Sequence, residues 1–143
     1  MKEIIINISF EQNYFKGWVE DDPTTPRCTV LSVNFIDLIN SLEESIDKEM
    51  EIRLDNNIPI PEWYEKKDYR VIYKFKNTAS LLKAYSSFIP LSAISRNTGI
   101  NKGLLSHYAT GLKKPRKRQR ELIVTTLKKI GNRLTGTKIS DDS

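Results

Sequence analysis

The first part of the chain alternates apolar and polar residues in the manner of β-strands. In residues 4–9 three isoleucines fall on one side of a predicted strand, and residues 14–20 form a second run after a polar break at residues 12–13. Two such runs joined by a short polar break are typical of a β-hairpin. Residues 21–26 contain two prolines and two aspartates and predict a turn, so that residues 28–33 form a third short strand.

The next segment repeats its apolar residues every three or four positions, the period of an α-helix. Asn34, with Asp37 three residues later, is a typical helix start, because its side chain can accept a hydrogen bond from a free amide. The helix is expected to fade near residues 55–57, before an extended connector that contains Pro59 and Pro61. Its predicted inner face consists of Phe35, Leu38, Ile39, Leu42, Ile46 and Met50.

Residues 69–76 alternate again and predict a fourth strand. The order βββαβ allows one amphipathic helix to cover one face of a small antiparallel sheet. The predicted fold class is therefore α+β, with a compact first domain over residues 1–77.

The remaining residues, 78–143, show no strand pattern and predict an all-α second domain. Gly99 and Gly111 are expected to end helices, since glycine adopts positive φ at little cost. Pro115 suits the first position of a helix. The expected helices are a segment around Leu81 that stops before Pro90, then residues 91–98, 101–110 and about 115–134.

A short helix, a glycine turn and a second short helix form the geometry of a DNA-reading helix-turn-helix. Ser95 supplies a small residue where the two helices cross. An ordinary helical hairpin that binds nothing is the alternative, because it can meet some of these requirements. The residues expected to hold the second helix from inside are Ile94, Ile100, Leu105 and Tyr108.

The opposite face of that second helix supplies the candidates for reading base edges. Lys102 could donate to a guanine, and Ser106 and His107 could donate or accept in the major groove. Gly103 would allow close approach to the DNA, and Asn101 is also the expected N-cap. An ordinary exposed histidine is the alternative for His107. The base-reading candidates are Asn101, Lys102, Gly103, Ser106 and His107.

Charge is distributed unevenly along the chain, whose net charge is +5. Residues 1–78 contain 10 Lys/Arg and 15 Asp/Glu, whereas residues 79–143 contain 13 Lys/Arg and 3 Asp/Glu. Such asymmetry is expected when one part of a protein meets a polyanion and the other does not.

Six of the eight residues in 113–120 are basic, at and before a predicted helix N-terminus. Positive charge is unfavourable at that end of a helix unless an anion binds there. Phosphates would satisfy this requirement without reading sequence. A solvated surface and, in a eukaryote, a nuclear-localisation signal are the alternatives. The phosphate-binding candidates are Thr110, Lys113, Lys114, Arg116, Lys117, Arg118 and Arg120.

Composition argues against several other classes of protein. A single cysteine, Cys28, and a single histidine permit no disulfide, no cysteine metal cluster and no two-histidine metal site, so neither a metal nor a cofactor is expected. The longest apolar run, residues 4–6, is too short to span a bilayer, and no secretory signal precedes it. A cytoplasmic protein without enzymatic activity is expected. The alternative is a metal-dependent nuclease that uses Glu20, Asp21, Asp22 and Asp37.

Residues 95–101 and 105–115, followed by the basic start of a long helix, resemble the C-terminal domain of HicB-type antitoxins. The version they most resemble is that of Bacteroidetes-like bacteria, itself similar to the phage-repressor helix-turn-helix family. The βββαβ order also resembles the HicB toxin-binding domain. One departure is that residues 29–32 stand where family members often have a Pro-Gly-Cys turn.

The resemblance implies a protein with two tasks. The acidic first domain would cover a small, basic, RNA-cleaving HicA-like toxin, and the basic second domain would bind double-stranded DNA at the operator of its own operon and repress it. A homodimer or a higher oligomer is expected, because helix-turn-helix proteins usually read paired half-sites. The alternative is a stand-alone transcriptional regulator whose first domain senses a ligand or dimerises.

Overall fold

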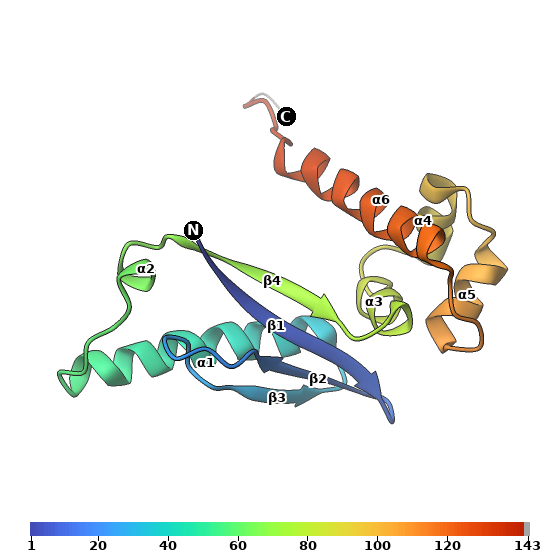
Figure 1. Cartoon of the computed structure of the whole chain (residues 1–143). Coiled ribbons are helices and arrows are strands. Elements are labelled where there is room, and N and C mark those ends of the chain that lie inside the picture. The colour runs from blue at the N-terminus through green and yellow to red at the C-terminus, as the bar shows by residue number, and fades with distance from the viewer. Residues whose placement is uncertain (142–143) are drawn as a thin grey trace. The chain divides into compact units, whose positions relative to one another are not determined.

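The computed structural model describes residues 1–141 and separates into two compact units. The first unit, Met1–Ser80, contains a four-stranded sheet, and the second unit, which begins at Leu81, is built from helices (Figure 1). The chain is therefore mixed α and β, as predicted. The division falls inside helix α3 (Thr78–Tyr85), three residues after the expected boundary at Asn77.

The sheet of the first unit has the strand order β3-β2-β1-β4. β1 and β2 are antiparallel and joined at Gln12 and Asn13, whose φ angles of 53° and 67° are those of a tight hairpin turn. The predicted hairpin is thus confirmed. The four strands are β1 (Lys2–Glu11), β2 (Tyr14–Val19), β3 (Thr29–Ser32) and β4 (Tyr69–Phe75).

The expectation of a purely antiparallel sheet is wrong, because β4 lies parallel to β1. Ile4 pairs with Val71, Ile6 with Tyr73 and Ile8 with Phe75. The reason is the long connection from β3 to β4, which includes α1 (Phe35–Asp55). It returns the chain to the end of the sheet where β1 begins, so β4 runs in the same direction as β1. Crossovers of this length are what parallel pairing requires.

Helix α1 packs on one face of the sheet. Its start is as predicted, since the Asn34 side chain accepts a hydrogen bond from the Asp37 amide at 3.1 Å. Ile39 is half-buried, whereas the other residues of the predicted inner face are buried. The buried apolar residues of the first unit that lie in β1, β2 and α1 are Ile4, Ile6, Ile8, Phe15, Val19, Phe35, Leu38, Leu42, Ile46 and Met50.

Gly17 allows β2 to approach α1 closely. A Cβ at this position would lie 2.7 Å from Cδ1 of Leu42 and 3.1 Å from Cδ2 of Leu38. We expect Gly17→Val to lower the free energy of unfolding of the first unit by about 1–3 kcal/mol through overpacking. Urea denaturation followed by tryptophan fluorescence measures this effect, because Trp18 and Trp63 both belong to the first unit.

A matched control for this experiment is Thr29→Val on the neighbouring strand. Thr29 is exposed, and valine has nearly its shape, so the unfolding midpoint should hardly move. An equal loss of stability in both variants would contradict close packing at Gly17.

A short helix, α2 (Glu62–Glu65), lies in the segment where only an extended connector and a strand were expected. Four residues are too few to show helical periodicity, and the preceding Pro61 has extended backbone angles (φ −61°, ψ 142°). Aromatic contacts fix this helix to the sheet. Trp63 lies 5.4 Å from Tyr69 between ring centroids, and Tyr64 donates a 2.6 Å hydrogen bond to Asp47 of α1.

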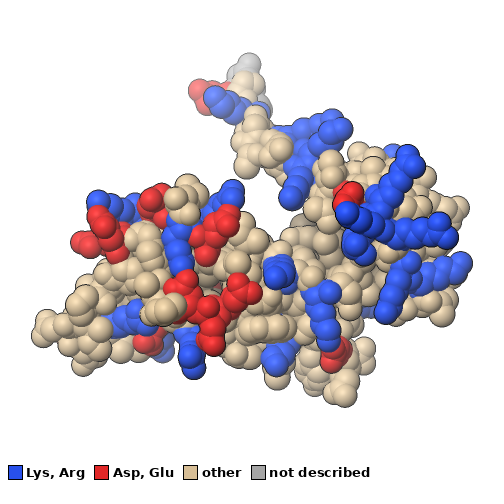
Figure 2. Space-filling view, in the orientation of Figure 1, with Lys and Arg blue, Asp and Glu red and all other residues tan. Residues whose placement is uncertain are grey.

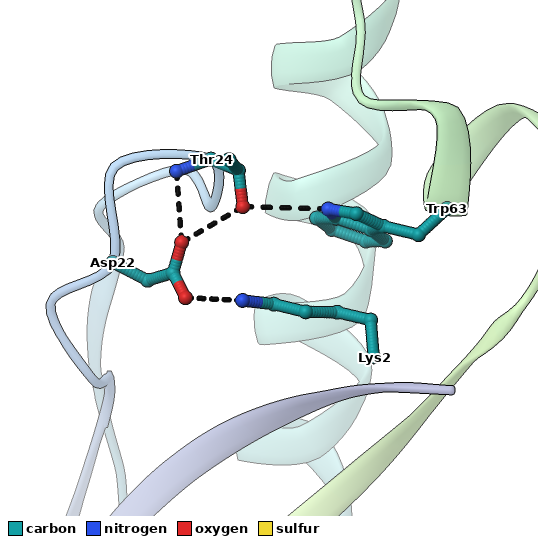
Figure 3. Close-up of polar contacts among 4 residues, drawn as sticks. All are labelled: Lys2, Asp22, Thr24 and Trp63. Carbon is teal, nitrogen blue, oxygen red and sulfur yellow. Dashed lines mark hydrogen bonds and ion pairs between the residues drawn. The ribbon is translucent and has the colours of Figure 1, made fainter.

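A polar cluster connects the start of β1, the turn after β2 and helix α2 (Figure 3). The Asp22 carboxylate pairs with Lys2 and accepts hydrogen bonds from the amide and the hydroxyl of Thr24, each at 2.8 Å. The Thr24 hydroxyl accepts in turn from the Trp63 indole at 3.3 Å. The hydrogen bond from Lys2, followed by those from Thr24, lowers the pKa of Asp22 below its ordinary value of 3.8.

The lowered pKa predicts a pH-dependent contribution to the stability of the first unit. The ionised Asp22 stabilises the fold at pH values above its ordinary pKa, and this contribution is lost as the pH falls below that value. The difference in unfolding free energy between wild type and Asp22→Asn should therefore be largest near neutral pH and shrink below about pH 4. Glu11, whose pKa is lowered by Lys76, titrates in both proteins and cancels in this difference. A pH-independent difference would contradict the role of the ionised Asp22.

The second unit consists of the remainder of α3 and three further helices, α4 (Leu91–Thr98), α5 (Lys102–Thr110) and α6 (Lys117–Thr135). The expectation that Pro115 begins the last helix is wrong, since Arg116 is its N-cap and has extended backbone angles. Pro115 and Arg116 belong to the connection between α5 and α6. The core of the unit is formed by Leu82, Ile94, Ile100, Leu105, Tyr108 and Ile123.

Candidate nucleic-acid interface

The turn between α4 and α5 is held by side chains of α4. Gly99 ends α4 with a φ of 79°, the left-handed conformation that glycine adopts most readily. The Ser95 hydroxyl donates to the Ile100 carbonyl at 2.6 Å, and the Thr98 hydroxyl accepts from the Ile100 amide at 3.1 Å. Ser95 was expected only as a small residue at the helix crossing, and its hydroxyl also bonds across the turn.

The inner side of the α4–turn–α5 segment agrees with the sequence prediction. Ile94 and Leu105 have no exposed surface, and Ile100 and Tyr108 are also buried. These residues belong to one apolar core, which fixes the rotation of α5 about its axis. The opposite side of α5 is therefore directed away from that core.

The N-terminus of α5 is capped by Asn101. Its side-chain oxygen accepts from the Gly103 amide at 2.8 Å and from the Leu104 amide at 3.4 Å. Of the two polar groups of this side chain, the capping bonds engage the oxygen and not the amide nitrogen. A Cβ at Gly103 would lie 3.0 Å from the capping oxygen, so glycine here also suits the cap.

Lys102, Gly103, Ser106 and Thr110 are exposed on the outer side of α5. The Thr110 hydroxyl donates at 3.2 Å to the His107 carbonyl, a backbone acceptor in the last turn of α5. His107 is only half-exposed, in contrast to the other outer residues. Its Nδ1 is buried and has no hydrogen-bond partner within residues 1–141.

Basic residues from the end of α5 to the first turn of α6 surround a hollow of about 610 Å³. The floor and walls include Leu104, Tyr108 and Gln119. We call this feature the basic hollow, and its four cationic residues are Lys113, Lys114, Arg116 and Arg118. The other two basic candidates lie outside its lining. Lys117 is 3.9 Å from Glu121, one turn along α6, and Arg120 is exposed.

Gln119 and Arg96 were not among the sequence candidates. Gln119 accepts a hydrogen bond from the Tyr108 hydroxyl and thereby ties α6 to α5 in the lining of the hollow. Its lack of charge inside a basic block was the signal that could have identified it. Arg96 is exposed in the last turn of α4, where a cation also suits the helix C-terminus.

The interface contains no carboxylate of its own. The chain has no Asp or Glu between Asp68 and Glu121, a segment that includes α4, α5 and the basic hollow. Figure 2 shows Lys and Arg side chains crowded on the second unit, whereas most of the visible Asp and Glu side chains belong to the first. The potential at this surface is therefore strongly positive, as binding to a polyanion requires.

Of the four carboxylates considered for a nuclease, two pair with different cations, and Glu20 is exposed. Asp22 pairs with Lys2, and Asp21 lies 3.2 Å from Arg27, whereas Asp37 is in the first turn of α1. Within residues 1–141, no group of three histidine, cysteine or carboxylate side chains could hold a metal ion. Nor does any helix of this segment have the length and apolar character needed to cross a membrane.

This surface combines two kinds of chemical group. Outer residues of α5 offer donors and acceptors, and the neighbouring hollow offers four cations. The chain matches no protein-family model, no curated protein and no solved structure.

Proposed function

We propose that this protein binds double-stranded DNA in a sequence-specific manner and represses transcription. The observation that supports this most is the position of α5 between a buried core and solvent. Leu105 and Tyr108 fix the helix, so that Lys102 and Ser106 are exposed on its outer side, together with the bare backbone of Gly103. A second helix with this placement lies in the major groove in helix-turn-helix proteins.

The two groups of residues would have different tasks. Lys102, Ser106 and the accessible edge of His107 would read base edges, where donors and acceptors differ between base pairs. The basic hollow would hold phosphates, which position the protein and make binding salt-dependent. Its place at the N-terminus of α6 adds the partial positive charge of free helix amides.

Replacing Lys102 should reduce the preference for one DNA sequence. We expect Lys102→Ala or His107→Ala to cost about 1–3 kcal/mol on the preferred duplex and much less on a scrambled one. Fluorescence anisotropy of a duplex selected from a random library measures both affinities. Lys48→Ala, an exposed lysine of the first unit, is the matched control and should change neither. Equal binding of selected and scrambled DNA by wild type would refute sequence-specific reading.

We further propose that the first unit neutralises a small basic toxin of the HicA type and that the operator belongs to the shared operon. The observation that favours this is the acidic outer side of α1. Tyr64 and Tyr73 donate hydrogen bonds to Asp47 and Glu43, whereas within residues 1–141 the side chains of the outermost carboxylates have no hydrogen bond or ion pair. A basic protein would complement this surface electrostatically. The outermost carboxylates of α1 are Asp37, Glu44, Glu51 and Asp55.

Co-expression with the product of the adjacent reading frame tests this second proposal. We expect that product to be small, basic and toxic on its own, and to be harmless together with this protein. The double variant Glu44→Lys/Glu51→Lys should lose the protection, while Glu62→Lys/Glu65→Lys on α2 should keep it. Specific DNA binding without a toxic neighbour would favour the stand-alone regulator instead.

A further inference from the structure

The last turns of α6 extend beyond the core of the second unit (Figure 1). Ile123 and Thr126, in the first half of the helix, are buried in that core, and Leu127 packs against it. Ile130 is half-buried, whereas Leu134 is 66% exposed. All of residues 131–141 are exposed. Spacings of three and four residues place Leu127, Ile130 and Leu134 on one side, so an apolar stripe continues past its own core.

Gly131 lies beside this stripe in the interior of the helix. Glycine there destabilises a helix relative to alanine, because it has more conformational freedom to lose. Nothing in the same unit explains it, since a Cβ at Gly131 would have no heavy atom within 4 Å apart from the helix itself and its chain neighbours. Close approach of another backbone is a common reason for a small residue on a helix surface.

We propose that the exposed half of α6 is a self-association surface, on which two copies of this chain pair their α6 helices in antiparallel orientation. In this arrangement Ile130 of each copy fills the space above Gly131 of the other. Leu127 then lies against Leu134 of the second copy, and the contact is the same from both sides, as a two-fold interface demands.

The choice of a second copy as the occupant rests partly on the proposed DNA binding, because helix-turn-helix units read half-sites in pairs. The residues also favour it directly. Positions 127 and 134 are equally far from the centre between Ile130 and Gly131, so the stripe is complementary to its own antiparallel copy. The flanking Lys128 and Arg133 repel a second cationic helix, so added salt should strengthen this association, whereas salt weakens binding to DNA.

Sedimentation velocity of the full chain without DNA, over a range of concentrations and two salt concentrations, tests the proposal. Wild type should shift reversibly from the mass of one chain towards that of two. Leu134→Glu and Gly131→Leu should each weaken this association on the order of tenfold or more, because Gly131 lies at its centre and Leu134 makes the contact with Leu127 of the second copy. Circular dichroism should show unchanged folding, since both positions face open space.

The matched control is Leu112→Glu, because Leu112 is 70% exposed and lies outside α6. It should associate as wild type does. Wild type that stays a single chain at all concentrations would overturn the proposal, as would association unaffected by Leu134→Glu. Association that salt abolishes would instead indicate an acidic partner surface and would overturn it too. Since no DNA is present, self-association can be found or lost independently of the proposed DNA reading.

Discussion

A variant with alanine at Lys113, Lys114, Arg116 and Arg118 should bind every DNA duplex weakly, whatever its sequence. These four residues line the basic hollow and have no ion pair with a carboxylate among the described residues. Each phosphate contact releases counterions and steepens the dependence of log affinity on log salt by about 0.9. We therefore expect the slope to become shallower by about 3 to 4 in this variant.

Anisotropy titrations between about 50 and about 200 mM salt provide the slope for wild type and variant. The ratio of affinities for selected and scrambled DNA should stay close to that of wild type, because the base-reading residues are intact. Lys117→Ala/Arg120→Ala is the matched control, since both residues belong to the same basic block but lie outside the hollow. If the control lost as much DNA affinity per removed charge, the residues of the hollow would contribute no more to binding than the other residues of the basic block.

Leu105→Ala should unfold the second unit selectively. Leu105 has no exposed surface and lies in the core of that unit, so the truncation leaves a cavity that costs about 2–5 kcal/mol. A unit of this size has only a small stability margin, so a loss of this magnitude removes much or all of it. DNA binding should be lost together with the helical core.

The tryptophans make this prediction specific. Both belong to the first unit, so urea denaturation followed by tryptophan fluorescence should be nearly unchanged, while the share of the helical circular dichroism signal that comes from the second unit is lost at lower urea and that of α1 is kept. Leu112→Ala, at an exposed leucine, should leave both signals as in wild type. If tryptophan fluorescence followed the loss of helix, the two units would fold as one.

Most elements could be predicted because they have a strong local period. The alternation in residues 4–9 and the three- to four-residue spacing from Phe35 to Met50 led to the correct strand and helix. The direction of β4 could not be predicted in this way, because alternation is the same in parallel and antiparallel strands. It depends on the path of the chain over α1, which is a property of the tertiary structure.

The outer face of α5 could also be predicted, since the burial of Leu105 and Tyr108 follows from helical spacing. The half-burial of His107 could not, because it depends on tertiary packing and not on helical spacing. Similarly, the basic block indicated phosphate binding, but only the structure separates the four residues of the hollow from Lys117 and Arg120.

The segment without carboxylates between Asp68 and Glu121 has a kinetic consequence. A surface without carboxylates does not repel phosphates. It can release one DNA phosphate and contact the next without leaving the duplex, so the protein should slide and hop along DNA. Its search for an operator would then be partly one-dimensional. We expect the association rate with a single target to rise when the flanking DNA is lengthened, and this gain to disappear at high salt.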